Sequence, residues 1–63
     1  MNPQEQEKRN RVYKVVDVLA EADKKGEVIA IPNLILFIQS QFFVSKRTAL
    51  EYIELARYII STL

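Results

Sequence analysis

The sequence predicts an all-α domain of three helices, with at most one short strand between the first helix and the second. Three observations support this fold class. Apolar residues recur every three or four positions in three separate stretches, which is the spacing of an amphipathic helix. Residues that end or start helices stand between these stretches, namely Gly26, Pro32 and Ser45. The chain has 63 residues, so we expect a single domain over residues 1–63.

The first helix is expected from about Pro3 to Lys25. Proline is favoured in a first helical turn, and Lys24 and Lys25 complement the negative end of the helix dipole. Gly26, the only glycine, is well placed as the left-handed residue that follows a helix. The apolar stripe of this helix consists of Val12, Val15, Val16, Leu19, Ala20 and Ala22.

Residues 27–31 are expected to form a short strand or an extended linker. This segment is rich in β-branched residues, and Pro32 disfavours a helical conformation at Ile31. Pro32 itself suits the first position of a second helix, which should end at Gln41 or Phe42. Apolar residues lie nearly all round this helix, so we expect other parts of the protein to cover it from more than one side. They are Leu34, Ile35, Leu36, Phe37, Ile38 and Phe42.

The third helix is expected from Lys46 to near the end of the sequence, with Ser45 as its N-cap. Its apolar residues recur at helical spacing from Ala49 to Leu63. Together the three apolar faces predict a core, in which Phe42 and Tyr52 are also expected. Its other expected members are Val15, Val16, Leu19, Leu34, Ile35, Ile38, Val44, Ala49, Ile53, Ala56 and Ile60.

The composition excludes several kinds of site. The chain has no cysteine and no histidine, which excludes disulfides and iron–sulfur clusters and removes the commonest general base. Asp17, Glu21 and Asp23 form the nearest group of carboxylates, without a second catalytic group beside them. We therefore expect no catalytic, cofactor-binding or metal-binding residue and no enzyme activity. No apolar run reaches the roughly 20 residues of a membrane span, and the first residues lack a signal-peptide pattern. These absences predict a soluble, cytoplasmic protein without a membrane partner.

The segment from Phe43 to Ile53 resembles the turn and recognition helix of helix-turn-helix DNA-binding proteins. In that family the turn often reads Gly-Val-Ser. Two variable residues follow, then threonine, a small apolar residue, and an aliphatic residue four positions further on. The matching residues here are Val44, Ser45, Thr48, Ala49 and Ile53, and Lys46 and Arg47 hold the variable, DNA-facing positions.

Two residues depart from the pattern of this family. Phe43 stands in place of the turn glycine, and Gln39 in place of a small residue of the second helix. The order of elements also resembles the first part of a winged helix, without a wing hairpin after the third helix. Small regulators of archaea and their viruses are often built in this way. The resemblance implies a small transcription regulator that binds duplex DNA through its third helix.

Lys46 and Arg47 are the first candidate DNA contacts. Cations in a first helical turn oppose the helix dipole, whereas free backbone N–H groups beside two cations suit an anion such as a DNA phosphate. The alternative is that both side chains simply point into water. The net charge of +1 and the pI of about 8.0 neither require nor exclude a nucleic-acid partner.

A second basic cluster lies on the first helix and could contact phosphates; its members are Lys8, Arg9, Arg11 and Lys14. The alternative is a solvated helix face on which Glu5 and Glu7 neutralise it. Glu51 and Glu54 share a face of the third helix with Arg47 and Leu50, which weighs against strong DNA binding. They could accept from cytosine amino groups, and the alternative is ordinary surface charge or pairing with Arg47 and Arg57. The candidate DNA-binding residues are therefore Ser45, Lys46, Arg47, Thr48, Leu50, Glu51, Lys8, Arg9 and Arg11.

The apolar residues outnumber those that three helices of this length can enclose, which predicts a homodimer. Two recognition helices that read successive major grooves should start about 34 Å apart. The competing function is a protein–protein interaction module or accessory subunit that uses the same apolar surface. The expected dimer interface consists of Leu36, Phe37, Leu55, Tyr58, Ile59 and Leu63.

Overall fold

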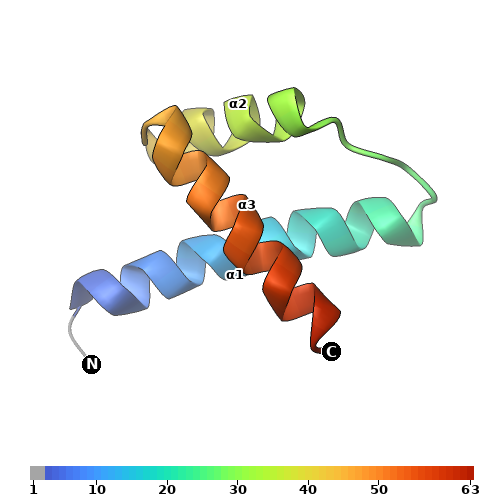
Figure 1. Ribbon diagram of the computed structural model, residues 1–63, viewed down its shortest axis with the longest axis horizontal. Helices are drawn as coiled ribbons and strands as arrows, with labels where there is room; N and C mark the ends of the chain where they lie inside the picture. The colour runs from blue at the N-terminus through green and yellow to red at the C-terminus, as the bar shows by residue number, and fades with distance from the viewer. Residues whose placement is uncertain (1–2) are drawn as a thin grey trace.

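The computed structural model describes residues 3–63 and confirms the all-α fold. It contains three helices, α1 (Pro3–Lys24), α2 (Ile31–Phe42) and α3 (Lys46–Ser61), and no strand within the described residues. In Figure 1, α3 descends from the end of α2 and crosses α1. Packing against both other helices makes α3 the central element of the fold. Within residues 3–63, no helix has the length and apolar character that crossing a membrane requires.

The end of α1 is fixed by the glycine expected there. Gly26 has a φ of 71°, in the left-handed region that favours glycine. The Gly26 N–H donates to the Asp23 carbonyl at 3.0 Å, and the Glu27 N–H donates to the Ala22 carbonyl at 2.8 Å. These two bonds form a Schellman motif, which satisfies carbonyl groups that the end of a helix leaves unpaired.

The linker between α1 and α2 forms no strand. Residues 27–30 have no regular secondary structure, and Val28 is fully exposed to solvent. The expectation that Ile31 is extended is wrong, because α2 begins at this residue. The Leu34 N–H donates to the Ala30 carbonyl at 3.0 Å, which closes the first turn around Pro32. Proline is tolerated there because the first N–H groups of a helix lack intrahelical partners anyway.

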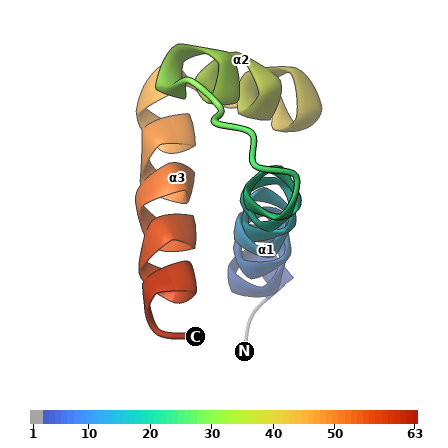
Figure 2. The same ribbon diagram turned by 90° about the vertical axis from the view of Figure 1, so that its right-hand side faces the viewer.

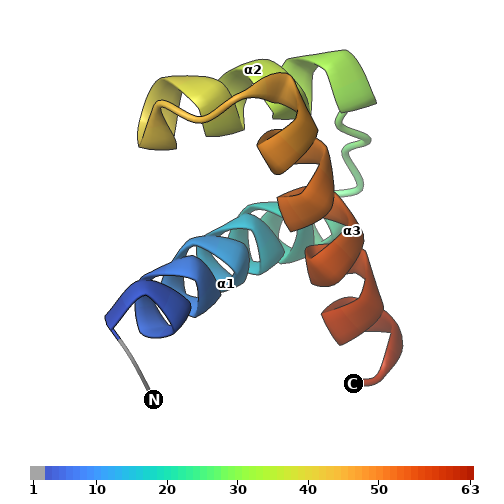
Figure 3. The ribbon, with the colours of Figure 1, turned by 60° about the vertical axis from the view of Figure 1, so that its left-hand side comes forward.

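The turn between α2 and α3 depends on an unusual backbone conformation at Phe43. This residue has a φ of 54° and a ψ of 48°, and among residues 3–63 it is the only non-glycine residue with a positive φ. The left-handed conformation costs a residue with a Cβ about 1–2 kcal/mol. The Phe43 N–H donates to the Gln39 carbonyl at 2.9 Å, and the Gln39 side chain donates to the Val44 carbonyl at 3.4 Å. After this turn, α3 leaves α2 at a steep angle (Figures 2 and 3).

The core forms where the apolar faces of the three helices meet. Ala49 and Ala56 of α3 have no exposed surface, so their small side chains let the neighbouring helices approach closely. Most of the predicted core and Tyr52 are confirmed as buried, and Val12 and Ala22, which were not in the predicted set, are buried as well. The buried residues are Val12, Val15, Val16, Ala22, Leu34, Ile35, Ile38, Ala49, Tyr52, Ile53 and Ala56.

Four residues expected in the core are less buried than the helical spacing suggested. Leu19, Phe42 and Val44 are half-buried and pack against the rim of the core. Ile60 is exposed. Its position follows the stripe of Ile53 and Ala56, but the last turns of α3 extend past α1 in Figure 1. A helical stripe therefore predicts burial only as far as a neighbouring helix covers it.

Replacing Ser45 with alanine should destabilise the fold by about 1 kcal/mol, because the N-cap of α3 is lost. The Ser45 hydroxyl oxygen accepts from the Thr48 backbone N–H at 3.2 Å, which confirms the predicted cap. Urea unfolding of Ser45→Ala measures the change. Ser61→Ala, which removes an exposed hydroxyl from the other end of the same helix, should change stability by much less. Equal effects of the two substitutions would contradict the capping role.

Candidate nucleic-acid interface

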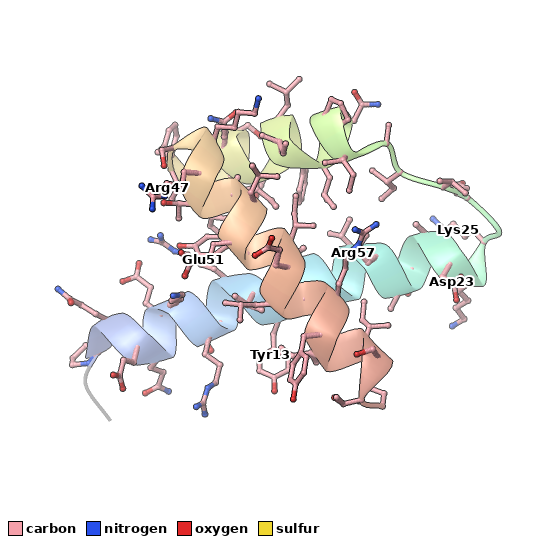
Figure 4. The ribbon with its side chains drawn as sticks, viewed as in Figure 1. Tyr13, Asp23, Lys25, Arg47, Glu51 and Arg57 are labelled. Atoms are coloured by element: carbon pink, nitrogen blue, oxygen red, sulfur yellow. The ribbon has the colours of Figure 1, made fainter. Side chains whose placement is uncertain are left out.

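The first turns of α3 present two cations at one end of the molecule. Lys46 and Arg47 are both exposed, directly after the cap at Ser45. Figure 4 places Arg47 at the end of the molecule opposite Lys25. Thr48 is half-buried, and its hydroxyl oxygen accepts from the Ser45 hydroxyl at 3.1 Å. Leu50 is exposed one turn further along α3.

The segment that leads to these cations contains no acidic residue. Between Glu27 and Glu51 the sequence has no aspartate or glutamate, and its only charged residues are Lys46 and Arg47. The exposed polar side chains of α2 in this segment are amides and hydroxyls: Asn33, Ser40 and Gln41. The residues from α2 to the start of α3 therefore offer cations and neutral polar groups to an anionic partner. The absence of acidic residues from this segment is visible in the sequence. The helix-turn-helix pattern does not reveal it, because that pattern does not include the α2 residues.

Lys8 and Glu51, both candidate DNA contacts, form an ion pair with each other. The pair joins α1 to α3, and each side chain is about half exposed. The hydrogen bond to the Glu51 carboxylate raises the pKa of Lys8 above its ordinary value. The Lys8 ammonium thus compensates Glu51, one of the two acids that share a helix face with Arg47; the other is Glu54, which is exposed. As a result, Glu51 does not present an unpaired negative charge beside the start of α3.

Arg11, another candidate DNA contact, connects all three helices. One of its guanidinium nitrogens donates to Glu7 at 2.5 Å, and the other donates to the Tyr52 hydroxyl at 3.4 Å. Its guanidinium carbon also lies 5.4 Å from the centre of the Phe42 ring, within the range of a cation–π interaction. The hydrogen bond to Tyr52 raises the pKa of Arg11 above its ordinary value. Arg9, by contrast, is exposed on the first half of α1.

The aromatic rings of Phe42 and Tyr52 meet beside Arg11. Their centres are 6.2 Å apart and their planes make an angle of 79°, which is an edge-to-face contact. Phe42 is the last residue of α2, and Tyr52 lies in the second turn of α3. This contact therefore fixes the first half of α3 relative to α2, and with it the direction in which Lys46 and Arg47 project.

The residues expected at a dimer interface lie in two separate places. Leu55 and Ile59 line a groove between α3 and α1, with Val12 at its floor. Leu36 lines a different hollow, beside Pro32 and Lys46 at the α2 end. The last turns of α3 and the α2 helix are at opposite ends of α3 in Figures 1 and 2, so these two sets do not form one surface.

Exposure also divides the expected interface residues. Phe37 and Ile59 are half-buried and pack against the core, so their side chains already contribute to the fold. Tyr58 and Leu63 are 69% and 93% exposed. Tyr13 of α1 is also half exposed. Exposed apolar residues therefore lie both on the last half of α3 and, as Leu36 and Phe43, at the α2 end.

Comparison with protein-family models, with curated proteins and with solved structures gave no match for this chain. Among residues 3–63, no group of three or more acidic, histidine or cysteine side chains is arranged to hold a metal ion.

Arg11→Ala should lower the urea midpoint of unfolding, whereas Arg9→Ala should leave it nearly unchanged. The Arg11 side chain contacts residues of all three helices, and Arg9 is exposed. Both substitutions remove one positive charge from the same helix, so the comparison isolates the packing and hydrogen bonds of Arg11. Two variants with the same midpoint would show that the Arg11 contacts contribute nothing to stability.

Proposed function

We propose that this protein is a small transcription regulator that binds duplex DNA as a homodimer, with the first turns of α3 on the DNA. One observation carries the proposal: Lys46 and Arg47 are exposed at the start of α3, directly after the turn that follows α2, in a segment free of acidic residues. The exposed polar side chains of α2 are amides and hydroxyls, so they add no negative charge that would oppose phosphates.

The position of the two cations is unfavourable for the isolated protein. A helix start carries partial positive charge, so a lysine and an arginine there cost stability that an acidic residue would add. An anionic partner turns this electrostatic cost into a gain, because the helix start and both side chains then attract the same group. Phosphate contacts of this kind give affinity that falls steeply with salt.

In this proposal, the exposed residues on one face of α3 recognise the DNA sequence. Arg47 can donate two hydrogen bonds to a guanine edge in the major groove, and Leu50 offers an apolar contact to a thymine methyl group. Glu51 is paired with Lys8. Arg11 is held by its contacts with Tyr52 and Phe42. Glu51 and Arg11 therefore contribute to DNA binding by positioning α3. Arg9 is exposed and remains a candidate phosphate contact.

The last half of α3 is the proposed dimer interface. Leu55, Tyr58 and Leu63 are exposed there, and Ile59 lies between them and the core. α3 is about 24 Å long at about 1.5 Å per residue. Two copies that meet through the ends of α3 would hold the two helix starts at the far sides of the dimer. A separation of about 34 Å between those starts, as successive major grooves require, is within the reach of two such helices.

Replacing Lys46 and Arg47 together with alanine should weaken binding to random duplex DNA by about tenfold or more at low salt. The slope of log affinity against log salt should become shallower by about 0.9 if only Lys46 contacts a phosphate, and by about 1.8 if Arg47 also does so on random DNA. Fluorescence anisotropy with a labelled duplex, measured over a series of salt concentrations, gives both quantities.

Lys24→Ala with Lys25→Ala is the matched control. It removes the same charge from the end of α1, where Lys24 is the last helical residue and Lys25 lies opposite Arg47 in Figure 4. This control should retain most of the affinity of the parent. No binding by the parent at low salt would reject the DNA-binding function and favour the protein-interaction alternative. Equal losses in the two double variants would reject α3 as the contact.

Sedimentation equilibrium at micromolar concentration should give a mass near twice the 7.3 kDa of one chain. Tyr58→Glu should shift this mass to that of a monomer, because a charge would be buried in the interface, and Tyr58→Phe should remain dimeric. Tyr58 suits this test better than Ile59, whose half-buried side chain also packs against the core. A parent mass of one chain would contradict the dimer.

A further inference from the structure

We infer that Phe43 is a DNA-contacting residue, whose ring packs against apolar groups of the duplex next to the start of α3. The inference rests on the proposed DNA-binding function and adds to it a residue that the helix-turn-helix pattern does not supply, since the pattern has glycine at this position. The apolar groups that a duplex offers to such a ring are thymine methyl groups and the carbons of deoxyribose.

The backbone at Phe43 is the first observation. Its φ of 54° lies in the left-handed region, where a residue with a Cβ is strained and glycine is not. The turn needs this conformation to end α2 and start α3, but nothing in the turn needs a side chain. A strained residue that persists at such a position commonly has a function that the unstrained residue would lose.

The side chain of Phe43 is the second observation. The residue is 91% exposed, so the ring contributes almost nothing to the core that would offset the strain. The neighbouring Phe42 ring, by contrast, contacts Tyr52 and Arg11. The strain of the Phe43 backbone is offset only if a partner covers the exposed ring.

The charged residues near Phe43 in the sequence favour a partner that is anionic and also has apolar groups. The nearest charged residues along the chain are Lys46 and Arg47, and no acidic residue lies within the segment from Val28 to Leu50. A second copy of this chain would bring the same cations against these, and like charges would oppose that contact. Duplex DNA instead supplies phosphates for the cations and apolar edges for the ring.

Phe43→Gly tests the inference, because it removes the ring and also relieves the strain. This variant should unfold at a higher urea concentration than the parent. It should bind a labelled mixed-sequence duplex about five- to tenfold more weakly, as expected when part of a ring is no longer buried. The salt slope should stay unchanged, since no charge is lost.

Phe43→Trp gives a direct readout, because the chain has no other tryptophan. It should keep the affinity of the parent, and its fluorescence should change when the duplex is added. Val28→Gly, which removes a fully exposed apolar side chain from the linker, is the control and should bind as the parent does.

A duplex with uracil in place of thymine distinguishes the two apolar groups. If the ring contacts thymine methyl groups, the preference for the thymine duplex should be weaker in Phe43→Gly than in the parent, and only the contact of Leu50 should remain. If the ring contacts deoxyribose, both proteins should show the same preference, and Phe43→Gly should still bind more weakly overall.

The inference is overturned if Phe43→Gly binds DNA as tightly as the parent while the Lys46→Ala, Arg47→Ala variant loses affinity as expected. It is also overturned if Phe43→Gly dissociates the dimer and retains its DNA affinity, because the ring would then face a second copy. A parent that binds no DNA at low salt rejects the proposed function itself, which the cation variants and the salt series reveal separately.

Discussion

The rest of the structure depends on the left-handed backbone at Phe43. This residue ends α2 and lets α3 leave at a steep angle, after which Phe42 and Tyr52 pack edge to face. Arg11 then reaches both rings from α1. The core, the crossing of α3 over α1 and the exposure of Lys46 and Arg47 all follow from the direction that this turn gives to α3. The conformation is strained for phenylalanine, so the surrounding packing must hold it.

The charges divide into those that build the fold and those that remain at the surface. Lys8 with Glu51 and Arg11 with Glu7 are engaged in contacts on or between helices. Lys46 and Arg47 are exposed in a segment without acids. Exposed apolar residues lie at both ends of α3, with Phe43 before its start and Tyr58 and Leu63 near its end. In the proposed function, one helix therefore carries a DNA-binding end and a dimerising end.

The sequence predicted the parts of the fold that depend on neighbours along the chain. The three helices, the caps at Gly26 and Ser45, and most of the core follow from helical spacing and from residue preferences at helix ends. The exposure of Ile60 could not be predicted in this way, because it depends on where α3 passes α1. The contacts of Lys8 and Arg11 depend on that same crossing, so their helix positions alone suggested only a basic surface. The left-handed conformation of Phe43 contradicts the preference of phenylalanine. Only the turn between α2 and α3 requires this conformation.

The most direct test of the central claim is to follow the backbone amides of the isotope-labelled protein by NMR while unlabelled duplex DNA is added at low salt. If the α2–α3 end binds DNA, the chemical shifts should change for residues 43–50 and for the exposed face of α2. The amides of residues 55–63 should change little, because that end of α3 is assigned to the dimer. Shift changes confined to residues 55–63, or to the linker at residues 25–29, would contradict the account.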